Sequence, residues 1–165
     1  MNKSTKIFVA GHKGFLGSAI LKKLVQNKFE NLLIEDKKNL NLLSFDQVYK
    51  YFKKIKPQIV INAAGNSGNL YQCINIPATL YYVNTTIQNN LFECARLFNC
   101  QNLVYYASSC IYPEIVSRKI NENDFLSKKI ELNTEGYAAS KIAGVLACKS
   151  YNKQYFKWKI ILSCF

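Results

Sequence analysis

The sequence predicts an α/β protein built on a Rossmann-like, doubly wound parallel sheet. Short apolar runs alternate with segments of helical periodicity along the chain, and a glycine-rich turn follows the first run. Alternating strands and helices form βαβ units, whose right-handed crossovers place helices on both faces of a parallel sheet. We therefore expect three α/β/α layers, the strand order 3-2-1-4-5 and one domain over residues 1–165.

Five short apolar runs are the expected strands. The first, Ile7-Phe8-Val9-Ala10, is a continuous run typical of a strand that is buried on both faces. Four similar runs follow at residues 32–34, 59–61, 103–107 and 160–162. The segments between these runs are long enough to hold one helix each.

Four of the intervening segments carry helix signals. Apolar residues recur at steps of four over residues 16–24 and predict a helix directly after the glycine turn. Ser44 and Gln47 form a plausible capping box for a second helix, which Pro57 ends. The last two helices are expected at residues 75–98 and 136–153, with a polar loop over residues 113–134 before the second of them.

Composition and charge limit the functional classes to which the protein can belong. At 49% hydrophobic and 19% charged residues the chain is ordinary for a globular domain. Its net charge of +12 comes from scattered lysines, and arginine occurs only at Arg96 and Arg118, so we do not expect dedicated nucleic-acid binding. No apolar run is long enough for a membrane span, and the amino terminus has no secretory cleavage signal. We therefore expect a cytoplasmic protein.

The cysteines do not form a metal-binding pattern. No two stand in a Cys-x-x-Cys pair, and His12 is the single histidine, so we expect no zinc or other metal site. Reduced thiols, mostly buried, are the expectation for a cytosolic protein. The six are Cys73, Cys94, Cys100, Cys110, Cys148 and Cys164.

Three glycines after the first strand form a candidate phosphate cradle. Gly11, Gly14 and Gly17 follow the spacing G-x-x-G-x-x-G. Such glycines allow a tight turn, a close approach of the backbone to a diphosphate, and close packing of the helix on the strand. The amino end of the helix then faces the anion. A glycine turn without a ligand is the alternative interpretation.

The end of the second strand bears on the choice between NAD and NADP. Asp36 lies 19 residues after Gly17, near the position of a carboxylate that binds the ribose 2′-hydroxyl of NAD. Lys13, Lys37 and Lys38 favour NADP instead, because they can neutralise a 2′-phosphate. For Lys37 and Lys38 a solvated loop is an equally good interpretation.

Tyr137 and Lys141 are the candidate catalytic pair. They stand at i and i+4, on one face of the expected helix. A neighbouring ammonium, beside a cationic nicotinamide, would stabilise the phenolate and lower the pKa of the tyrosine from about 10. Tyr137 can then exchange a proton with an alcohol or carbonyl while hydride moves to or from the cofactor. Ser108 or Ser109, at the end of the fourth strand, is expected to hydrogen-bond the substrate oxygen.

These motifs together resemble the extended short-chain dehydrogenase/reductases that act on nucleotide sugars. The resemblance rests on "GHKGFLGSAI", "KPQIVINAAG", "YYASSCIYP" and "YAASKIAG", and on the helix with Asn84 and "ECAR". Within that family the chain is most similar to the epimerase/reductases of GDP-4-keto-6-deoxymannose. The resemblance spans essentially the whole chain and implies an NADP-dependent epimerase/reductase with a GDP-sugar substrate.

By position, the resemblance implies roles for individual residues. Ser108, Tyr137 and Lys141 would be the reductase triad, and Cys110 the acid/base of epimerisation at carbons 3 and 5, although a buried packing role is the alternative for Cys110. The family's NADPH, or NAD in its place, would lie on the glycine loop, on the loop after the third strand and on Lys141. With the residues argued above, the candidate cofactor residues are Gly11, His12, Lys13, Gly14, Phe15, Leu16, Gly17, Asp36, Lys37, Ala63, Ala64, Gly65, Tyr137 and Lys141.

The chain departs from the family in two ways. Lys13 stands where the family has arginine, and Glu35-Asp36 where it tends to place basic residues. Family members are also longer, and their epimerase histidine and sugar-binding domain follow the fifth strand. We therefore expect this chain to be the cofactor-binding part of such an enzyme, with little or no activity by itself.

Other functions remain open from the sequence. They are a 4-epimerase or 4,6-dehydratase of a UDP- or dTDP-sugar, a non-catalytic dinucleotide-binding module, and a basic nucleic-acid binder. The family resemblance also implies a homodimer formed through the helices at residues 75–98 and 136–153.

Overall fold

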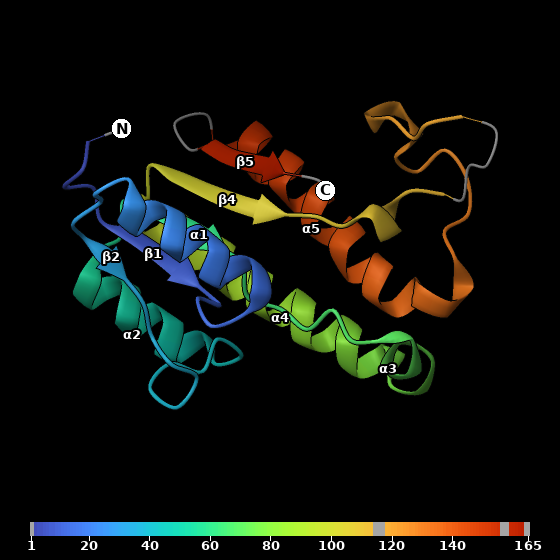
Figure 1. The fold of residues 1–165 in the computed structure, drawn as a ribbon, viewed down its shortest axis with the longest axis horizontal. Coiled ribbons are helices and arrows are strands. Elements are labelled where there is room, and N and C mark those ends of the chain that lie inside the picture. The colour runs from blue at the N-terminus through green and yellow to red at the C-terminus, as the bar shows by residue number, and fades with distance from the viewer. Residues whose placement is uncertain (1, 114–117, 156–158, 164–165) are drawn as a thin grey trace.

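A computed structural model describes residues 2–113, 118–155 and 159–163. Its centre is a parallel sheet of five strands, as expected (Figure 1). The strands are β1 (Ile7–Ala10), β2 (Leu32–Leu33), β3 (Ile59–Asn62), β4 (Asn102–Tyr106) and β5 (Lys159–Ser163). The prediction of a doubly wound, Rossmann-like fold is confirmed.

The predicted strand order 3-2-1-4-5 is wrong. The sheet runs β2-β1-β3-β4-β5, so that β3 lies between β1 and β4. In register, Ile59 pairs with Ile7 on one side and with Asn102 on the other. Every residue of β3 is buried, which requires strands on both sides and helices on both faces. The two half-buried residues of β2 suit an edge.

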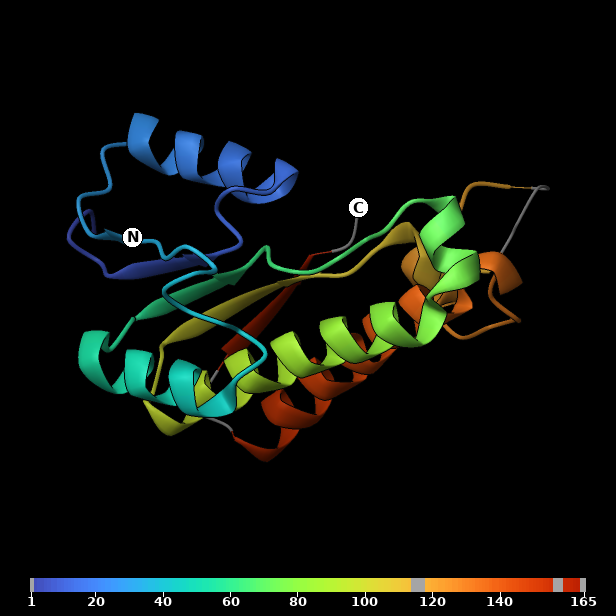
Figure 2. The ribbon, with the colours of Figure 1, turned by 90° about the horizontal axis from the view of Figure 1, so that it is seen from below.

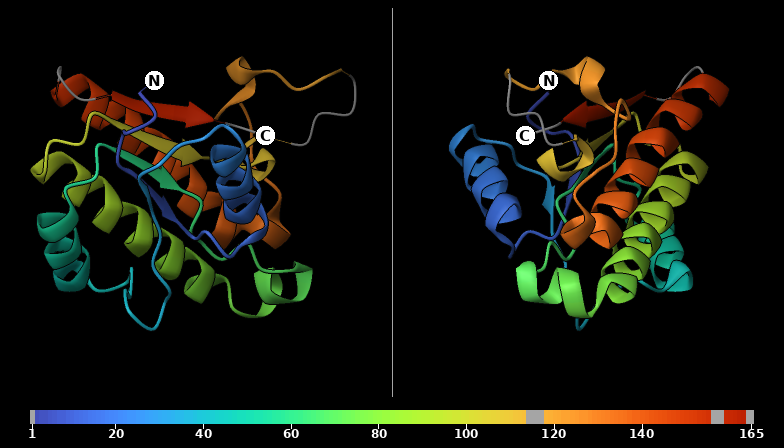
Figure 3. Two further views of the ribbon diagram at one scale, coloured as in Figure 1. Left: turned by 60° about the vertical axis from the view of Figure 1, so that its left-hand side comes forward. Right: turned by 90° about the vertical axis from the view of Figure 1, so that its right-hand side faces the viewer.

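The helices form two unequal layers. Helix α1 (Phe15–Gln26) alone covers one face, while α2 (Phe45–Ile55), α4 (Pro77–Leu97) and α5 (Glu135–Gln154) cover the other (Figure 2). Right-handed crossovers explain this division. The chain steps in one direction from β1 to β2, and in the opposite direction through β3, β4 and β5. Figure 3 shows α4 and α5 side by side, in extensive contact.

The main core lies between the sheet and the three-helix layer. Phe8 of β1 and Val60 of β3 pack there with Phe52 of α2 and Leu91 of α4, all at most 1% exposed. A smaller core under α1 contains Ile7, Val9, Ile59 and Ile61. The alternate residues of the central strands therefore face two separate cores, as the continuous apolar runs predict.

Local signals at α2 are confirmed in part. The Ser44 hydroxyl accepts a hydrogen bond from the Gln47 amide (3.4 Å), as an amino-terminal cap does. The Gln47 side chain accepts from the Asn41 amide (2.9 Å), so the capping box is one-sided. Lys56 ends the helix in a left-handed conformation (φ 49°), directly before Pro57.

One short helix was missed in a segment expected to be a loop. Helix α3 (Leu70–Asn75) begins at a complete capping box of Asn69 and Gln72. This box is an N-x-x-Q pattern, a variant of the usual serine or threonine signature. The helix has only six residues, which is too short for apolar periodicity to reveal.

The cysteines follow the expectation of reduced thiols. The five that are described are free, and four of them are buried. Cys164 lies outside the described residues. In the described part of the chain no helix is both long enough and apolar enough to cross a membrane.

Candidate functional site

The carboxyl ends of β1, β3 and β4 meet at one edge of the sheet, where ligands of open α/β folds bind. Two adjoining pockets lie there, with volumes of about 500 and 380 Å³. Both are lined by Gly14 and by residues 63–66, so the loops after β1 and β3 form the boundary between them. The arrangement suits an extended ligand with two end groups and a narrow centre.

The three glycines of the first loop are required for different structural reasons. Gly11 has φ +79°, and a Cβ there would lie 2.6 Å from the Ala63 carbonyl oxygen. A Cβ on Gly17 would lie 2.1 Å from the Gly11 oxygen. These two glycines therefore allow close backbone packing. A Cβ on Gly14 would meet only the Gly11 oxygen, at 3.3 Å. The missing side chain of Gly14 therefore leaves room in the pockets.

The amino end of α1 is open to an anion. Its cap residue is Gly14, which offers no side-chain acceptor, and the first turn holds no acidic residue. The first amides of a helix lack partners within the helix and carry a partial positive charge. A diphosphate placed over Gly14 would meet these amides, so the cradle fits the group that the sequence predicts.

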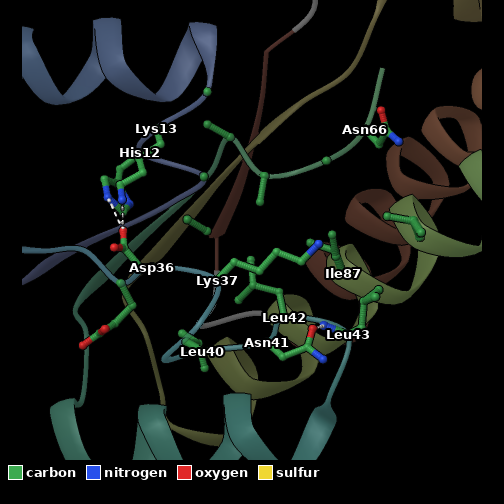
Figure 4. Close-up of a pocket in the computed structure, with 18 of the residues that line it drawn as sticks. His12, Lys13, Asp36, Lys37, Leu40, Asn41, Leu42, Leu43, Asn66 and Ile87 are labelled. Carbon is green, nitrogen blue, oxygen red and sulfur yellow. Dashed lines mark hydrogen bonds and ion pairs between the residues drawn. The ribbon is translucent and has the colours of Figure 1, made fainter. Parts of the chain in front are cut away.

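At the far end of the larger pocket, Asp36 lies beside the glycine loop. Its Oδ1 lies 2.6 Å from Lys13 Nζ and 3.5 Å from His12 Nε2 (Figure 4). The hydrogen bond from Lys13 holds the pKa of Asp36 below its usual value. Lys37 also lines this pocket and extends across it toward Ile87 in Figure 4, whereas Lys38 is not among its lining residues.

The loop after β3 is held by a buried asparagine. Asn84 of α4 accepts from the Asn66 amide (2.8 Å) and donates to the Asn66 carbonyl (2.9 Å). A Cβ on Gly65 would lie 2.8 Å from Asn84 Oδ1. The backbone of Ala63, Ala64 and Gly65 is thereby fixed against both pockets. Asn84 is 4% exposed, and a polar residue on the buried face of an expected helix is the signal that points to it.

The smaller pocket contains Tyr137 and Lys141, one turn apart on α5. Lys141 Nζ donates to the Tyr106 carbonyl (2.9 Å) and lies 5.9 Å from the centre of the Tyr137 ring. Burial lowers the pKa of Lys141 to about 8. Because α5 packs on α4 and β5, the sheet fixes this pair at the carboxyl end of β4.

The expected lowering of the Tyr137 pKa concerns the complex with a cationic nicotinamide, and it stays a prediction. Burial raises the pKa of Tyr137, and a hydrogen bond with Ser108 opposes that shift in part. The Lys141 ammonium is engaged with a carbonyl instead. In the protein by itself, desolvation of the phenolate therefore outweighs the hydrogen bond with Ser108.

Ser108 is favoured over Ser109 as the hydroxyl next to Tyr137. Ser108 accepts from the Cys110 amide (3.3 Å) at the start of the short helix Ser109–Ile111, while Ser109 is exposed. Cys110 is half-buried, and the short helix that contains it packs against α5, which carries Tyr137. Neither Ser108 nor Cys110 is among the residues that line the two pockets.

The structure thus gathers almost all of the predicted cofactor residues around the two pockets. Gly17 lines neither of them. The sequence reasoning missed an apolar wall of the larger pocket, built by Leu40, Leu42, Leu43, Val83 and Ile87 together with Asn66. The first three follow the charged residues 35–38 as an apolar patch without helical periodicity, which is a weak signal.

The fold and this edge of the sheet define a member of a known family. The model of the NAD dependent epimerase/dehydratase family matches residues 7–164, and the chain belongs to this family. It is 38% identical to a putative GDP-L-fucose synthase 2 of Arabidopsis thaliana over 98% of this chain and 49% of that protein. It is 35% identical to the GDP-L-fucose synthase of Escherichia coli K12, over 91% of this chain and 47% of that protein.

A solved structure agrees with these relatives. The GDP-mannoheptose C4 reductase MlghC of Campylobacter jejuni, determined with NADP bound, matches with a TM-score of 0.93 and 33% identity. The match covers 99% of this chain and 48% of that one. The chain therefore spans about half the length of the relatives it matches.

Proposed function

We propose that this chain supplies the cofactor-binding part of an NADP-dependent GDP-sugar epimerase/reductase that converts GDP-4-keto-6-deoxymannose to GDP-L-fucose. The observation that carries the proposal is the placement of Tyr137 and Lys141 in a pocket that adjoins the glycine cradle. The relatives named GDP-L-fucose synthase support the substrate class. The NADP in the Campylobacter reductase supports the cofactor.

The dinucleotide would lie across both pockets. Its adenosine end would occupy the larger pocket, against the apolar wall and beside Asp36 and Lys37. Its diphosphate would lie over Gly14, at the amides of the first turn of α1. Its nicotinamide end would reach the smaller pocket, where Lys141 would hold the ribose. A bound reduced nicotinamide would supply the hydride.

Tyr137 would act as the acid of the reduction. Its hydroxyl donates a proton to the carbonyl oxygen of the sugar as that carbon accepts hydride. A raised pKa keeps the phenol protonated and ready to donate. Ser108 would hold the same oxygen by a hydrogen bond, and the Lys141 ammonium would stabilise the phenolate that remains.

Cys110 would serve the epimerisation. A thiol can exchange protons with the carbons next to a keto group. Cys110 follows Ser108 by two residues in the short helix that packs against α5, so one bound sugar could meet both Cys110 and Tyr137.

We place the protein in the cytoplasm, as a homodimer formed through α4 and α5. The five described thiols are free, as in a reducing compartment. Tyr81 and Tyr82 on α4 and Leu146 on α5 are 46%, 62% and 42% exposed, which is apolar surface that a second copy would cover. Light scattering that gives a monomer would exclude the dimer.

The experiment joins this chain to the remaining half of a longer relative. A chimera carries residues 1–163 of this chain in place of the matching part of the E. coli relative, and NADPH oxidation is followed with GDP-4-keto-6-deoxymannose. The proposal expects turnover, which Tyr137→Phe reduces by at least about 100-fold. Turnover that survives Tyr137→Phe would exclude the mechanism.

A further inference from the structure

The ion pair at the proposed adenosine end of the larger pocket uses only one of the two oxygens of the Asp36 carboxylate. Lys13 Nζ (2.6 Å) and His12 Nε2 (3.5 Å) both contact the same oxygen of Asp36, Oδ1. Among the described residues, no hydrogen bond or ion pair reaches Asp36 Oδ2. The carboxylate is therefore compensated in charge and still has an acceptor to offer.

The lysines on this side of the pocket are free to move. The Lys13 side chain is 72% exposed, so water can solvate its ammonium when it leaves Asp36. Lys37 lines the same pocket and forms no ion pair within the described part of the chain. Glu35, which lies two residues before Lys37, is engaged by the Asn39 side chain (3.2 Å).

Two different ribose groups find a partner in this arrangement. A ribose 2′-hydroxyl can donate to Asp36 Oδ2 while Lys13 stays on Oδ1, so the pair need not break. A 2′-phosphate would be repelled by a bare carboxylate. Here Lys13 can turn from Asp36 to the phosphate, and Lys37 adds a second ammonium.

We infer that the Lys13–Asp36 pair is an exchangeable contact that lets this pocket bind both the 2′-hydroxyl form (NAD) and the 2′-phosphate form (NADP) of the dinucleotide. The inference rests on the proposed function and adds to it a cofactor range. The charge-assisted hydrogen bonds that form with the phosphate are offset by the loss of the exposed ion pair. The two forms should therefore bind with affinities within about tenfold of one another.

The test uses probes that lack nicotinamide and so do not depend on catalysis. Binding of ADP-ribose and of 2′-phospho-ADP-ribose is measured by titration calorimetry at one fixed ionic strength. Lys13→Met should weaken the binding of 2′-phospho-ADP-ribose by about tenfold and change the affinity for ADP-ribose by less than about threefold. Asp36→Asn should weaken the binding of ADP-ribose by about tenfold and leave the affinity for 2′-phospho-ADP-ribose unchanged or higher.

Lys50→Met is the matched control. Lys50 pairs with Asp46 at 2.7 Å and is 73% exposed, much as Lys13 is, but it lies on α2 outside the pocket. It should leave both affinities unchanged. Wild-type protein that prefers one probe by more than about 100-fold, or Lys13→Met that weakens both probes equally, would overturn the inference and leave the proposed function standing. Protein that binds neither probe would overturn both.

Discussion

The Lys141 ammonium on α5 donates a hydrogen bond to the main-chain carbonyl of Tyr106 at the end of β4, over 2.9 Å. This contact ties the helix that carries Tyr137 to the strand edge where the two pockets lie. It also removes Lys141 from water, and burial lowers its pKa to about 8. The pair predicted from an i, i+4 pattern is thus partly buried, with its lysine held by the strand edge.

The pKa of Lys141 predicts how stability depends on pH. A lysine at about 8 when folded, against an ordinary 10.5, binds fewer protons in the folded than in the unfolded state between these values. The free energy of unfolding should therefore gain up to about 3 kcal/mol from this group as pH rises from 8 to 10.5. Lys141→Met should lack this gain.

Urea unfolding of both proteins at a series of pH values isolates the effect. Other groups, such as Tyr151 and Cys94 with pKa values raised to about 12, are common to the two proteins and cancel in the difference. Parallel curves for wild type and Lys141→Met would show that burial of the ammonium carries no free-energy cost.

Two glycines of the cradle should respond differently to alanine. Gly17→Ala places a Cβ 2.1 Å from the Gly11 oxygen and should destabilise the fold by about 1–3 kcal/mol. Gly14→Ala meets only one atom, at 3.3 Å, and should change stability by less than about 1 kcal/mol. Gly14→Ala should nonetheless weaken NADPH binding, because the methyl group would occupy the proposed position of the diphosphate. Thermal melts and NADPH fluorescence titrations check both, and equal effects of the two variants on stability would argue against this division.

Asn84 should matter for both stability and binding. Asn84→Ala leaves the Asn66 amide and carbonyl without partners, at a cost of about 1–3 kcal/mol. The freed loop should also weaken NADPH binding, since residues 63–66 border both pockets. Asn89→Ala, an exposed asparagine on the same helix, is the control. Unchanged NADPH binding in Asn84→Ala would show that the loop at residues 63–66 does not depend on the Asn84 hydrogen bonds for its conformation.

Tyr137→Phe should separate binding from chemistry. Removal of the hydroxyl deletes the proposed proton donor but leaves the aromatic ring that lines the pocket. The NADPH dissociation constant should change by less than about threefold, while reduction by the chimera falls by at least about 100-fold. Parallel losses of binding and turnover would indicate a structural role for this tyrosine.

Much of the fold was predictable because local patterns determine it. The continuous apolar runs indicated the strands, and the glycine turn and the Tyr137–Lys141 spacing indicated the ligand edge. The strand order was not predictable in this way, since it depends on which strands pair in the folded sheet. The four buried residues of β3 and the two half-buried residues of β2 reflect a central position and an edge position.

The chemistry of the site was only partly readable from the sequence. Residue types suggested Asp36 for NAD and Lys13 for NADP, but the two are joined in one ion pair, which no spacing rule reveals. The partner of Lys141 is a main-chain carbonyl, and any residue at position 106 could provide it. Burial, which raises the pKa of Tyr137 in the protein by itself, is a property of the packed protein.

We propose above all that a dinucleotide lies across the glycine cradle with its nicotinamide beside Tyr137. A crystal structure of the protein with NADP tests this placement most directly. We expect the diphosphate within hydrogen-bond distance of the first amides of α1, and the nicotinamide ribose in contact with Lys141. Density for NADP elsewhere, or a nicotinamide turned away from the Tyr137 hydroxyl, would contradict the account.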